Sequence, residues 1–518
     1  MLLQRPSHPT ALTRTQRPTA VRLSPRCRAS PDVKREEQKL SLLLSWLSQN
    51  GAKGFDPDSR DTKVGVFVEG PGNRGLIATK DVRAGQVLFQ VPVKLGIIDD
   101  AETDELPWSV RLAAKLLRLK AESGACLWYD YVNVLPERVF NATSPDFTYE
   151  QVRAVSDVTA REEIDFSRWI ASSNFKRLTD DDDDRFRAML PEGTTEEAFC
   201  DAMTVVHSRT FSIPARDRPS GLARLLMPGI DLLNHAGDVD LNMCDAYRSG
   251  DHVLATDACR WDLVPKIGGE FLMIVSAVRD IVRGEEVTLS YGERSNDDFF
   301  VHYGFVPPRN PHDTVQLHDS LKSAVAWSIE RVHALGTAAP NDGLVELYET
   351  LCATHTEDSN VDTSGMEFVD SERTDKLKRR VNLQSNGRCD ERLALVLEKI
   401  HAYVSKFDSS MGTKEEFIRD HVSQRAFEVL AGMSGCDFLA DLDTLVAAMP
   451  DDDLHDFATM RRTYSDRIVS SPWYEKLRHT RNGRSADDFA SDTSTDLMTV
   501  QFRAYKSLIL WDCLLLNP

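Results

Sequence analysis

The sequence lacks the paired cysteines of a metal site. Nine cysteines are scattered along its 518 residues, and none stands in a Cys-x-x-Cys pair. Zinc ligands and the disulfides of small secreted domains both require closely spaced cysteines, so we expect neither a metal ion nor a disulfide framework. The cysteines are therefore predicted to be buried free thiols.

Long apolar runs and an excess of basic residues are also missing. No stretch reaches the roughly 18 apolar residues of a membrane-spanning helix, so we expect no transmembrane segment and no membrane partner. Lys and Arg number 62 against 81 Asp and Glu, a formal net charge of −19, which argues against nucleic acid as a partner. The length and the 41% hydrophobic content instead allow two or three domains with their own cores.

The amino terminus has no acidic residue before Asp32. Residues 1–30 carry many Ser, Thr and Pro residues and six arginines, namely Arg5, Arg14, Arg17, Arg22, Arg26 and Arg28. This composition is typical of an organelle transit peptide, and the continuous apolar core of a secretory signal is missing. We predict a transit peptide at 1–30, with a disordered basic tail as the alternative. Composition alone does not separate plastid from mitochondrion.

Short strands and turns are predicted near the beginning of the chain. An amphipathic helix is expected from Glu36 to Gln49, and residues 64–98 alternate in polarity or form short apolar runs between turn residues. The cluster Gly70–Gly75 is predicted to be a turn in which Asn73 adopts a positive φ. A helical block then follows at about 105–195, and its five consecutive aspartates at 180–184 are predicted to form a solvated loop.

Two further regions are expected to be helical. Thr194 and Glu197 have the spacing of a capping box, before a helix that ends at Ser208–Ser212. After Pro307-Pro308, apolar residues recur at helical spacing, and Thr413 and Glu416 form another capping box. We predict an all-helical domain at 311–518 with polar loops near 355–375 and 475–495.

Two stretches carry the chemistry of the chain. Gly229–His235 is an apolar run that ends in an Asn-His pair, and Gly284–Gly292 is predicted to be a turn and a strand that ends in Tyr291. Ser295-Asn296 and a helical stretch then lead to Tyr303-Gly304-Phe305. Each stretch alone is also typical of an ordinary strand end.

The order and separation of these stretches resemble the SET-domain protein methyltransferases. The resemblance implies an α+β fold at 36–310, in which the two stretches thread past each other in a knot-like crossing beside an S-adenosylmethionine site and a lysine channel. The helical insertion and helical tail look most like the plastid branch that methylates lysines of the Rubisco large subunit and of fructose-bisphosphate aldolase. This branch implies a chloroplast stromal location, one of these two proteins as partner, and a substrate-binding role for residues 311–518.

The resemblance also implies roles for individual residues. Tyr291 and Tyr303 would be catalytic, with Tyr291 also touching the substrate. Residues expected to bind the cofactor are Gly72, Arg74, Arg209, Asn234, His235 and Phe305. Residues expected at the lysine are Ser208, Arg209, Phe211 and Asp231.

Methyl transfer to an amine needs a neutral nitrogen aligned with the methyl group. A free lysine has a pKa of about 10.4, and an apolar channel beside a positive sulfonium lowers it. Two alternatives remain. A relative in the family methylates a histidine of actin, although the apolar Phe211 suits an aliphatic lysine better, and the chain could be an inactive cofactor-binding scaffold.

Overall fold

The computed structural model describes residues 31–515, except for 71–72, 100–105, 123, 125, 181–185, 187, 217, 219, 241–252, 256, 267, 355–378, 386, 434–435, 450–455 and 483–495. The predicted transit peptide, Gly72, Asp181–Asp184 and the predicted loop at 355–375 therefore lie outside the described residues. The chain divides into two units. Unit 1 comprises the described parts of the chain up to Lys94, Pro228–His235 and Asp257–Leu289, and unit 2 comprises Leu95–Met227, Ala236–Thr256 and Ser290–Pro518.

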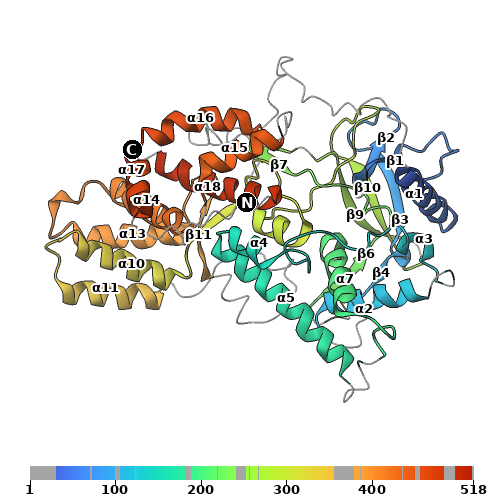
Figure 1. Cartoon of the computed structure of the whole chain (residues 1–518), viewed down its shortest axis with the longest axis horizontal. Helices are drawn as coiled ribbons and strands as arrows, with labels where there is room; N and C mark the ends of the chain where they lie inside the picture. The colour runs from blue at the N-terminus through green and yellow to red at the C-terminus, as the bar shows by residue number, and fades with distance from the viewer. Residues whose placement is uncertain are drawn as a thin grey trace, which may run out of the picture. The chain divides into compact units, whose positions relative to one another are not determined.

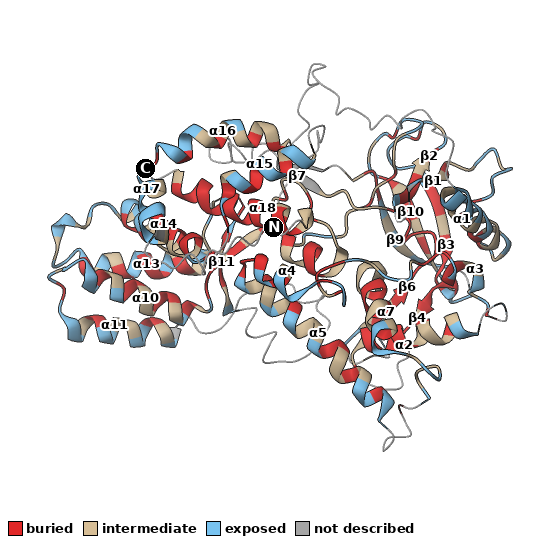
Figure 2. Cartoon of the chain, viewed as in Figure 1, coloured by how far each residue is buried: buried red, intermediate tan, exposed pale blue. Residues whose placement is uncertain are grey.

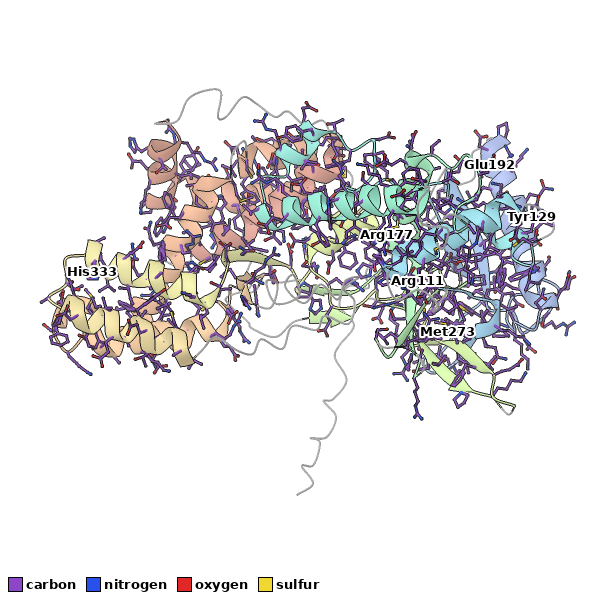
Figure 3. The ribbon with its side chains drawn as sticks, turned by 90° about the horizontal axis from the view of Figure 1, so that it is seen from below. Arg111, Tyr129, Arg177, Glu192, Met273 and His333 are labelled. Atoms are coloured by element: carbon purple, nitrogen blue, oxygen red, sulfur yellow. The ribbon has the colours of Figure 1, made fainter. Side chains whose placement is uncertain are left out.

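In its described residues, unit 1 consists of the α-helix α1 and short antiparallel strands. Helix α1 (Pro31–Gln49) buries Leu40, Leu43 and Leu47 along one face, which confirms the predicted amphipathic helix (Figures 1 and 2). Strands β1 (Val64–Gly70) and β2 (Asn73–Ala78) form a hairpin, and a three-stranded sheet has the order β3 (Val87–Pro92), β10 (Phe271–Ala277), β9 (Cys259–Pro265). Met273 of the central strand β10 is fully buried (Figure 3).

The segment that was predicted as a strand at 284–292 is not a regular strand. Gly284 has φ +87°, as a turn requires, but the residues after it make only isolated bridges, from Glu286 to Ile77 and from Leu289 to His235 and to Cys259. The polarity pattern was read correctly as extended backbone. Regular pairing did not follow, because Leu289 lies beside two different segments.

The amino-terminal part of unit 2 is a helical block around a small sheet. Its helices are α2 (Trp108–Ala121), α3 (Tyr129–Val132), α4 (Tyr149–Ala154), α5 (Val158–Thr179) and α7 (Glu196–Arg209). Its strands are β4 (Ile97–Ile98), β6 (Leu222–Leu226) and β5 (Thr210–Pro214) in one sheet, with β7 (Asp238–Asp240) and β8 (Val253–Ala255) in another. Helices α2 and α7 lie side by side (Figure 1).

Local contacts define the ends of these elements. The side chain of Thr195, not that of Thr194, caps α7 by accepting the Ala198 N–H at 3.1 Å, so the predicted capping box is wrong by one residue. The buried Asp99 carboxylate, next to β4, pairs with Arg111 of α2 at 2.8 Å and with Arg218 at 2.5 Å (Figure 3). Two guanidinium groups thus compensate one buried carboxylate.

The carboxyl-terminal part of unit 2 is mostly helical, as predicted. After α9 (Asn296–Asp298) and the π-helix η3 (Phe299–Tyr303) come α10 (Leu321–Ala334), α11 (Asn341–Thr354), α13 (Glu391–Val404), the 3-10 helix η4 (Ser409–Met411), α14 (Lys414–Gly432), α15 (Phe438–Ala448), α16 (Phe457–Val469), α17 (Pro472–Asn482) and α18 (Leu497–Leu515). The capping box of α14 is present. Two features were not foreseen: a two-stranded sheet of β11 (Thr314–His318) and β12 (Val381–Gln384), and α17 at the start of the predicted loop.

One hydrophobic core in unit 2 runs across residue 310. It includes Phe147 and Ile164 of the helical block, Phe300 of η3, and buried residues of α10, α13, α14, α15 and α18. Phe300 stacks on Phe502 of α18 with ring centroids 4.5 Å apart. Figure 2 shows that α18 is buried along nearly its whole length. The boundary at 310/311 stays a prediction, and packing joins the residues on both sides of it.

Three expectations from composition concern the whole chain. Among the helices that the structure describes, none is long and apolar enough to cross a membrane. Within the same residues, no group of three or more His, Cys, Asp or Glu side chains could hold a metal ion. The seven cysteines in the described ranges are all free, and four of them are buried: Cys126, Cys259, Cys436 and Cys513.

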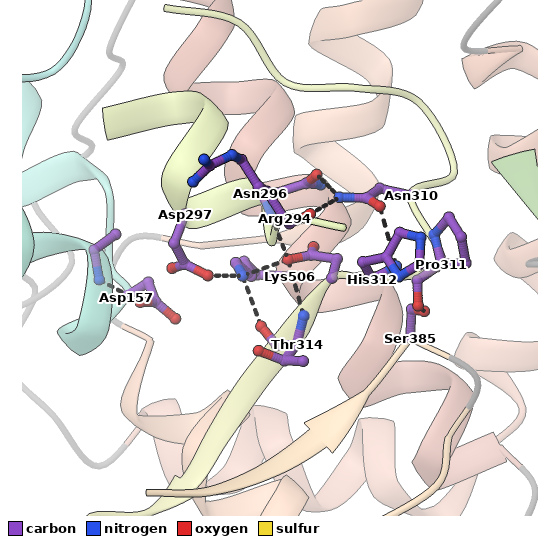
Figure 4. Close-up of polar contacts among 12 residues, drawn as sticks. Asp157, Arg294, Asn296, Asp297, Asn310, Pro311, His312, Thr314, Ser385 and Lys506 are labelled. Carbon is purple, nitrogen blue, oxygen red and sulfur yellow. Dashed lines mark hydrogen bonds and ion pairs between the residues drawn. The ribbon is translucent and has the colours of Figure 1, made fainter. Parts of the chain in front are cut away.

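A buried lysine joins several elements of unit 2. Lys506 of α18 is 0% exposed, and its ammonium donates to Asp297 Oδ2 at 2.6 Å and to Asp313 Oδ1 at 2.7 Å (Figure 4). It also donates to the Thr314 carbonyl oxygen at 2.6 Å. Burial acts to lower the pKa of Lys506, but the surrounding aspartates, which include Asp157, outweigh burial and raise it. The ammonium therefore stays charged.

Asp157 adds a titratable group to this cluster. Burial, followed by the neighbouring Asp297, raises the pKa of Asp157 to about 6, while its side chain caps α5 by accepting the Ala160 N–H at 2.8 Å. The folded state holds the Asp157 proton more tightly than the unfolded state does. The contribution of this proton to the free energy of unfolding is therefore complete below the unfolded pKa, near 3.8, and is lost as the pH rises through about 6.

We therefore expect Asp157→Asn to raise the melting temperature at pH 7.5, because Asn keeps the cap without the buried charge. The pKa shift corresponds to at most about 3 kcal/mol. Near pH 3.5, below the unfolded pKa of Asp157, the variant and the parent should melt together. Thermal unfolding of both proteins at about pH 3.5 and at pH 7.5 tests this. An equal difference at the two pH values would contradict it.

Candidate functional site

Unit 1 brings the two motif stretches together. The Leu289 N–H donates to the Asn234 carbonyl oxygen at 2.9 Å, and His235 and Leu289 form a parallel bridge. The Asn234 side chain donates through Nδ2 to the Arg74 carbonyl oxygen at 2.9 Å and to Glu286 Oε1 at 2.7 Å. Asn234 thus ties the hairpin strand β2 to both motif stretches.

Gly75 is the position where this contact requires glycine. A Cβ there would lie 2.7 Å from the Phe67 ring, 2.8 Å from Asn234 Nδ2 and 2.9 Å from Glu286 Oε1. Asn73 does not have the positive φ expected of it, because it already lies in β2 and pairs with Gly70. The extended strand at this point needs no left-handed residue.

The other predicted residues of unit 1 lie close to this contact in the chain. Arg74 is buried, and its guanidinium forms an ion pair with Glu36 of α1, so its carbonyl oxygen is the group that meets Asn234. Asp231 is buried in the turn that follows Gly229. Gly229 has φ +82°, and a Cβ would lie 3.0 Å from both Leu47 and Phe55. The binding roles assigned to Arg74 and Asp231 stay predictions.

Glu286 is a residue that the sequence did not single out. Burial raises the pKa of Glu286, although the hydrogen bond from Asn234 acts in the opposite direction. In an alternating stretch a glutamate is expected to face solvent, so periodicity gave no signal for this contact. We assign Glu286 to the support of the Asn234 side chain.

Asn234→Asp is expected to destabilise unit 1, because a second carboxylate would replace the amide that now donates to Glu286. The substitution should lower the free energy of unfolding by about 2 kcal/mol. This loss should shrink below pH 5, where the two carboxyl groups share a proton. Thermal unfolding measures it. The double variant Asn234→Asp with Glu286→Gln should recover part of the loss. If the single variant melts with the parent at pH 7.5, the side-chain contact does not contribute.

Unit 2 contains the aromatic residues. The ring centroids of Tyr291 and Tyr303 are 5.4 Å apart, and that of Phe305 is 6.4 Å from Tyr291 and 6.3 Å from Tyr303. Gly304 ends η3 in the left-handed conformation (φ +78°), and its N–H donates to the Phe299 carbonyl oxygen at 2.9 Å. A Cβ at Gly304 would lie 2.2 Å from the Phe140 carbonyl oxygen, so the turn that brings Tyr303 and Phe305 together requires glycine.

Tyr303 stays protonated in this setting. Burial raises the pKa of Tyr303, whereas the guanidinium of Arg294, 5.7 Å from the ring centroid, acts to lower it. The net shift is upward, so the hydroxyl is neutral at physiological pH and can donate a hydrogen bond.

The end of α7 delivers three predicted residues to unit 2. Ser208 and Arg209 are the last residues of α7, and the Ser208 hydroxyl donates to the Val205 carbonyl oxygen at 3.2 Å. Phe211 follows in β5, opposite Leu225 of β6, and is half-buried. The helix thus ends within the predicted span Ser208–Ser212, whereas the strand β5 that follows it was not predicted.

A histidine pair connects this helix end with the aromatic cluster. His207, next to Ser208, stacks on His302, next to Tyr303, with ring centroids 5.0 Å apart and an angle of 10° between the planes. Trp108 of α2 packs against His207 at 5.9 Å. The sequence analysis missed both histidines, because neither belongs to a recognisable motif. The two residues are far apart in the sequence and come into contact only in the fold. The Ser208 and Tyr303 backbones are thereby held near each other.

The residues found together allow a limited chemistry. Unit 1 offers an amide and a carboxylate, and the described part of unit 2 offers two tyrosine hydroxyls among aromatic rings. The aromatic cluster of unit 2 can orient and desolvate a reacting group and can donate hydrogen bonds to it.

The comparisons with known proteins agree with this architecture. Residues 73–292 match the family model of the SET domain. The structure resembles the SET domain of LSMT bound to lysine and AdoHcy, with a TM-score of 0.51 and 16% identity over 94% of this chain and 91% of that one. The complex of the same domain with methyllysine and AdoHcy gives a TM-score of 0.50 and 15% identity over 92% of this chain and 90% of that one. The fold is therefore a SET-domain fold with a helical carboxyl-terminal region, as the sequence predicted.

The curated relatives are named for the methylation of histidine and not of lysine. The chain is 27% identical to the actin-histidine N-methyltransferase of Mus musculus over 339 residues, which is 62% of this chain and 51% of that protein. It is 26% identical to the enzyme of the same name in Homo sapiens over 305 residues, 55% of this chain and 45% of that protein. The chain thus spans about half the length of the curated relatives it matches.

Proposed function

We propose that this chain is an S-adenosylmethionine-dependent protein methyltransferase that methylates a lysine side chain. The observation that carries the proposal is the Tyr291–Tyr303 pair, with ring centroids 5.4 Å apart. Tyr291 lies at the carboxyl end of the SET-domain match at 73–292, and Tyr303 follows that match. A tyrosine pair at this point suits methyl transfer, because the reaction needs orientation and desolvation more than a strong base.

The side chains fit the proposed cofactor. S-adenosylmethionine presents a carboxylate, an ammonium, a sulfonium and an adenine ring. Arg209 can pair with the carboxylate, Asn234 and His235 offer polar groups for the amino-acid part and the adenine, and the half-buried Phe305 can stack on the ring. When bound, the cofactor supplies an electrophilic methyl group.

The chain's own residues would prepare the acceptor. The Tyr291 hydroxyl orients the amine, and the neutral Tyr303 hydroxyl donates or accepts a hydrogen bond beside it. The backbone at Ser208 and Arg209 receives the ammonium before it loses its proton, and the family resemblance assigns Asp231 as an acid of the channel. The half-buried Phe211 ring provides an apolar wall, which favours the neutral amine.

Histidine is the second candidate acceptor. The actin-histidine N-methyltransferases, at 26–27% identity, support it. Lysine is supported by Phe211 and by the likeness to LSMT, whose structure holds lysine. Phe211→Tyr, with Phe166→Tyr as a control on α5, should reduce lysine methylation by about tenfold if the apolar wall excludes the charged amine. An unchanged rate would show that Phe211 does not form the wall of the lysine site.

The partner and the location form part of the proposal. The acid-poor residues 1–30 support import into an organelle, and the resemblance to the plastid branch favours the plastid. There the Rubisco large subunit and fructose-bisphosphate aldolase are the proposed substrates. A fusion of residues 1–40 to a fluorescent protein is expected to enter plastids. A fusion of the chain from residue 41 onward to the same fluorescent protein is not. Cytosolic fluorescence of the first fusion would remove these substrates and favour actin.

Cofactor binding tests the proposal at its base. Isothermal titration calorimetry of the folded chain with S-adenosylmethionine should show one site. No heat at any concentration up to the millimolar range would contradict both the enzyme and the inactive-scaffold alternative. Heat without methyl transfer to any protein would leave only the scaffold.

A further inference from the structure

Buried polar contacts from residues 310–313 hold the segment that carries Tyr291 and Tyr303. Asp313 Oδ1 accepts the Asn296 N–H at 3.0 Å. Asn310 Nδ2 donates to the Arg294 carbonyl oxygen at 2.8 Å and to Asn296 Oδ1 at 2.9 Å (Figure 4). Arg294 and Asn296 lie in the chain between Tyr291 and Tyr303. Residues 310–313 therefore hold the backbone at Arg294 and Asn296.

Lys506 is the centre of these contacts. Its ammonium joins Asp297, the next residue of α9, to Asp313, which already holds the Asn296 N–H, and also binds the Thr314 carbonyl oxygen. All three acceptors lie within 2.7 Å of Nζ, and the Lys506 side chain is fully buried. Water cannot replace the ammonium there without reopening the core, so its removal leaves buried carboxylates that must move or take up protons.

The contacts of α18 support the same segment through packing. Phe502, one helical turn before Lys506, stacks on Phe300 of η3, and the Gln501 amide donates to the Val306 carbonyl oxygen at 3.1 Å. The charged contact fixes α9, and the apolar contact fixes η3, which ends at Tyr303. A helix some 200 residues further along the chain thus sets the backbone on which both tyrosines depend.

We propose that Lys506 is a positioning residue for the active centre, which acts through Asp297 and Asp313 on the segment from Tyr291 to Phe305. This inference rests on the proposed function for its kinetic consequence but not for its structural one. It gives α18 a role in catalysis that is distinct from holding the protein substrate. Lys506 touches neither substrate nor cofactor in this account.

Arg503 provides a matched control on the same helix. Its guanidinium is equally buried and pairs with Asp441 of α15, with a further bond to the Ala154 carbonyl oxygen at 3.2 Å. Neither Asp441 nor Ala154 belongs to the segment from Tyr291 to Asp313. Lys506→Met and Arg503→Met each remove one buried cation of similar length, so their effects on global stability should be comparable.

The test combines hydrogen exchange with kinetics on the full-length chain. In Lys506→Met, the amide hydrogens of Asn296 and Gly304 should exchange at least about tenfold faster than in the parent, and in Arg503→Met they should not, beyond the change in global stability. With Rubisco or plastid aldolase as substrate, whichever the parent methylates, Lys506→Met should lower kcat by about 10- to 100-fold, with KM for the protein substrate little changed. Arg503→Met should keep kcat per folded molecule.

A double variant covers the case in which Lys506→Met does not fold. Lys506→Met with Asp313→Asn removes one carboxylate together with the ammonium, so it should fold more readily and still show the faster exchange and the lower kcat. Equal exchange and equal kcat in the Lys506 and Arg503 variants would overturn the proposal. If the parent methylates no protein, the proposed function fails, while the exchange comparison still decides whether Lys506 holds the segment.

Discussion

Replacing Tyr291 by phenylalanine is expected to slow methyl transfer by about 10² or more, on the order of a few kcal/mol of transition-state stabilisation. The ring would keep its contacts with Tyr303 at 5.4 Å and with Phe305 at 6.4 Å, so the fold and the cofactor affinity should remain nearly unchanged. The oxygen alone is lost, and with it the polar contact that orients the amine. Single-turnover rates and calorimetry on the same preparation separate the two effects.

Tyr149→Phe is the control for this variant. Tyr149 begins α4 and is 71% exposed, so removal of its hydroxyl should change neither the rate nor the affinity. If Tyr291→Phe methylates the same residue at the parent rate, the active centre has been assigned to the wrong tyrosine. A loss of cofactor affinity in Tyr291→Phe would instead show that the hydroxyl supports binding.

Truncation after residue 310 is expected to abolish both methyl transfer and the folding of unit 2. The sequence predicted a separate substrate-binding domain at 311–518, whose removal would leave a catalytic domain able to bind the cofactor. The core of unit 2 instead joins Phe147, Ile164 and Phe300 to the helices that follow residue 310. The truncated chain would expose this core and would lose Asp313 and Lys506, so we expect aggregation or a molten state.

Deletion of residues 1–30 is the control for the truncation. These residues precede α1, and the shortened chain should melt and bind the cofactor as the parent does. Circular dichroism and thermal unfolding measure the folding of both shortened chains, and calorimetry measures their cofactor affinity. A protein of residues 31–310 that unfolds cooperatively and binds the cofactor with parent affinity would show that the helical region is independent after all.

Periodicity predicted those elements whose burial follows one helical face. The helices α1, α10 and α13 lie where apolar residues recur every three or four positions, because each packs one stripe on a core. Helix α18 was also predicted from this spacing, although it is buried on every face. Capping residues located the start of α14 for the same local reason. Where two threonines compete, as at Thr194 and Thr195, local pattern does not decide, since both can accept the same kind of N–H bond.

Long-range polar contacts could not be predicted in the same way. The motif residues Asn234 and Tyr291 were found from the order of two stretches, but Glu286 and Lys506 owe their roles to partners 52 and 209 residues away. A charged residue in an alternating strand or an amphipathic helix is expected at the surface. Only the fold shows that these two charges are buried and paired.

The central claim is that the chain transfers a methyl group from S-adenosylmethionine to a lysine of a protein. The most direct measurement incubates the purified chain with methyl-labelled cofactor and, in separate reactions, Rubisco, plastid aldolase and actin, and then locates the label by tandem mass spectrometry of the digested proteins. The account predicts label on a lysine of Rubisco or aldolase with the parent chain, and none above background with Tyr291→Phe. Label on a histidine of actin, with none on lysine, would contradict it.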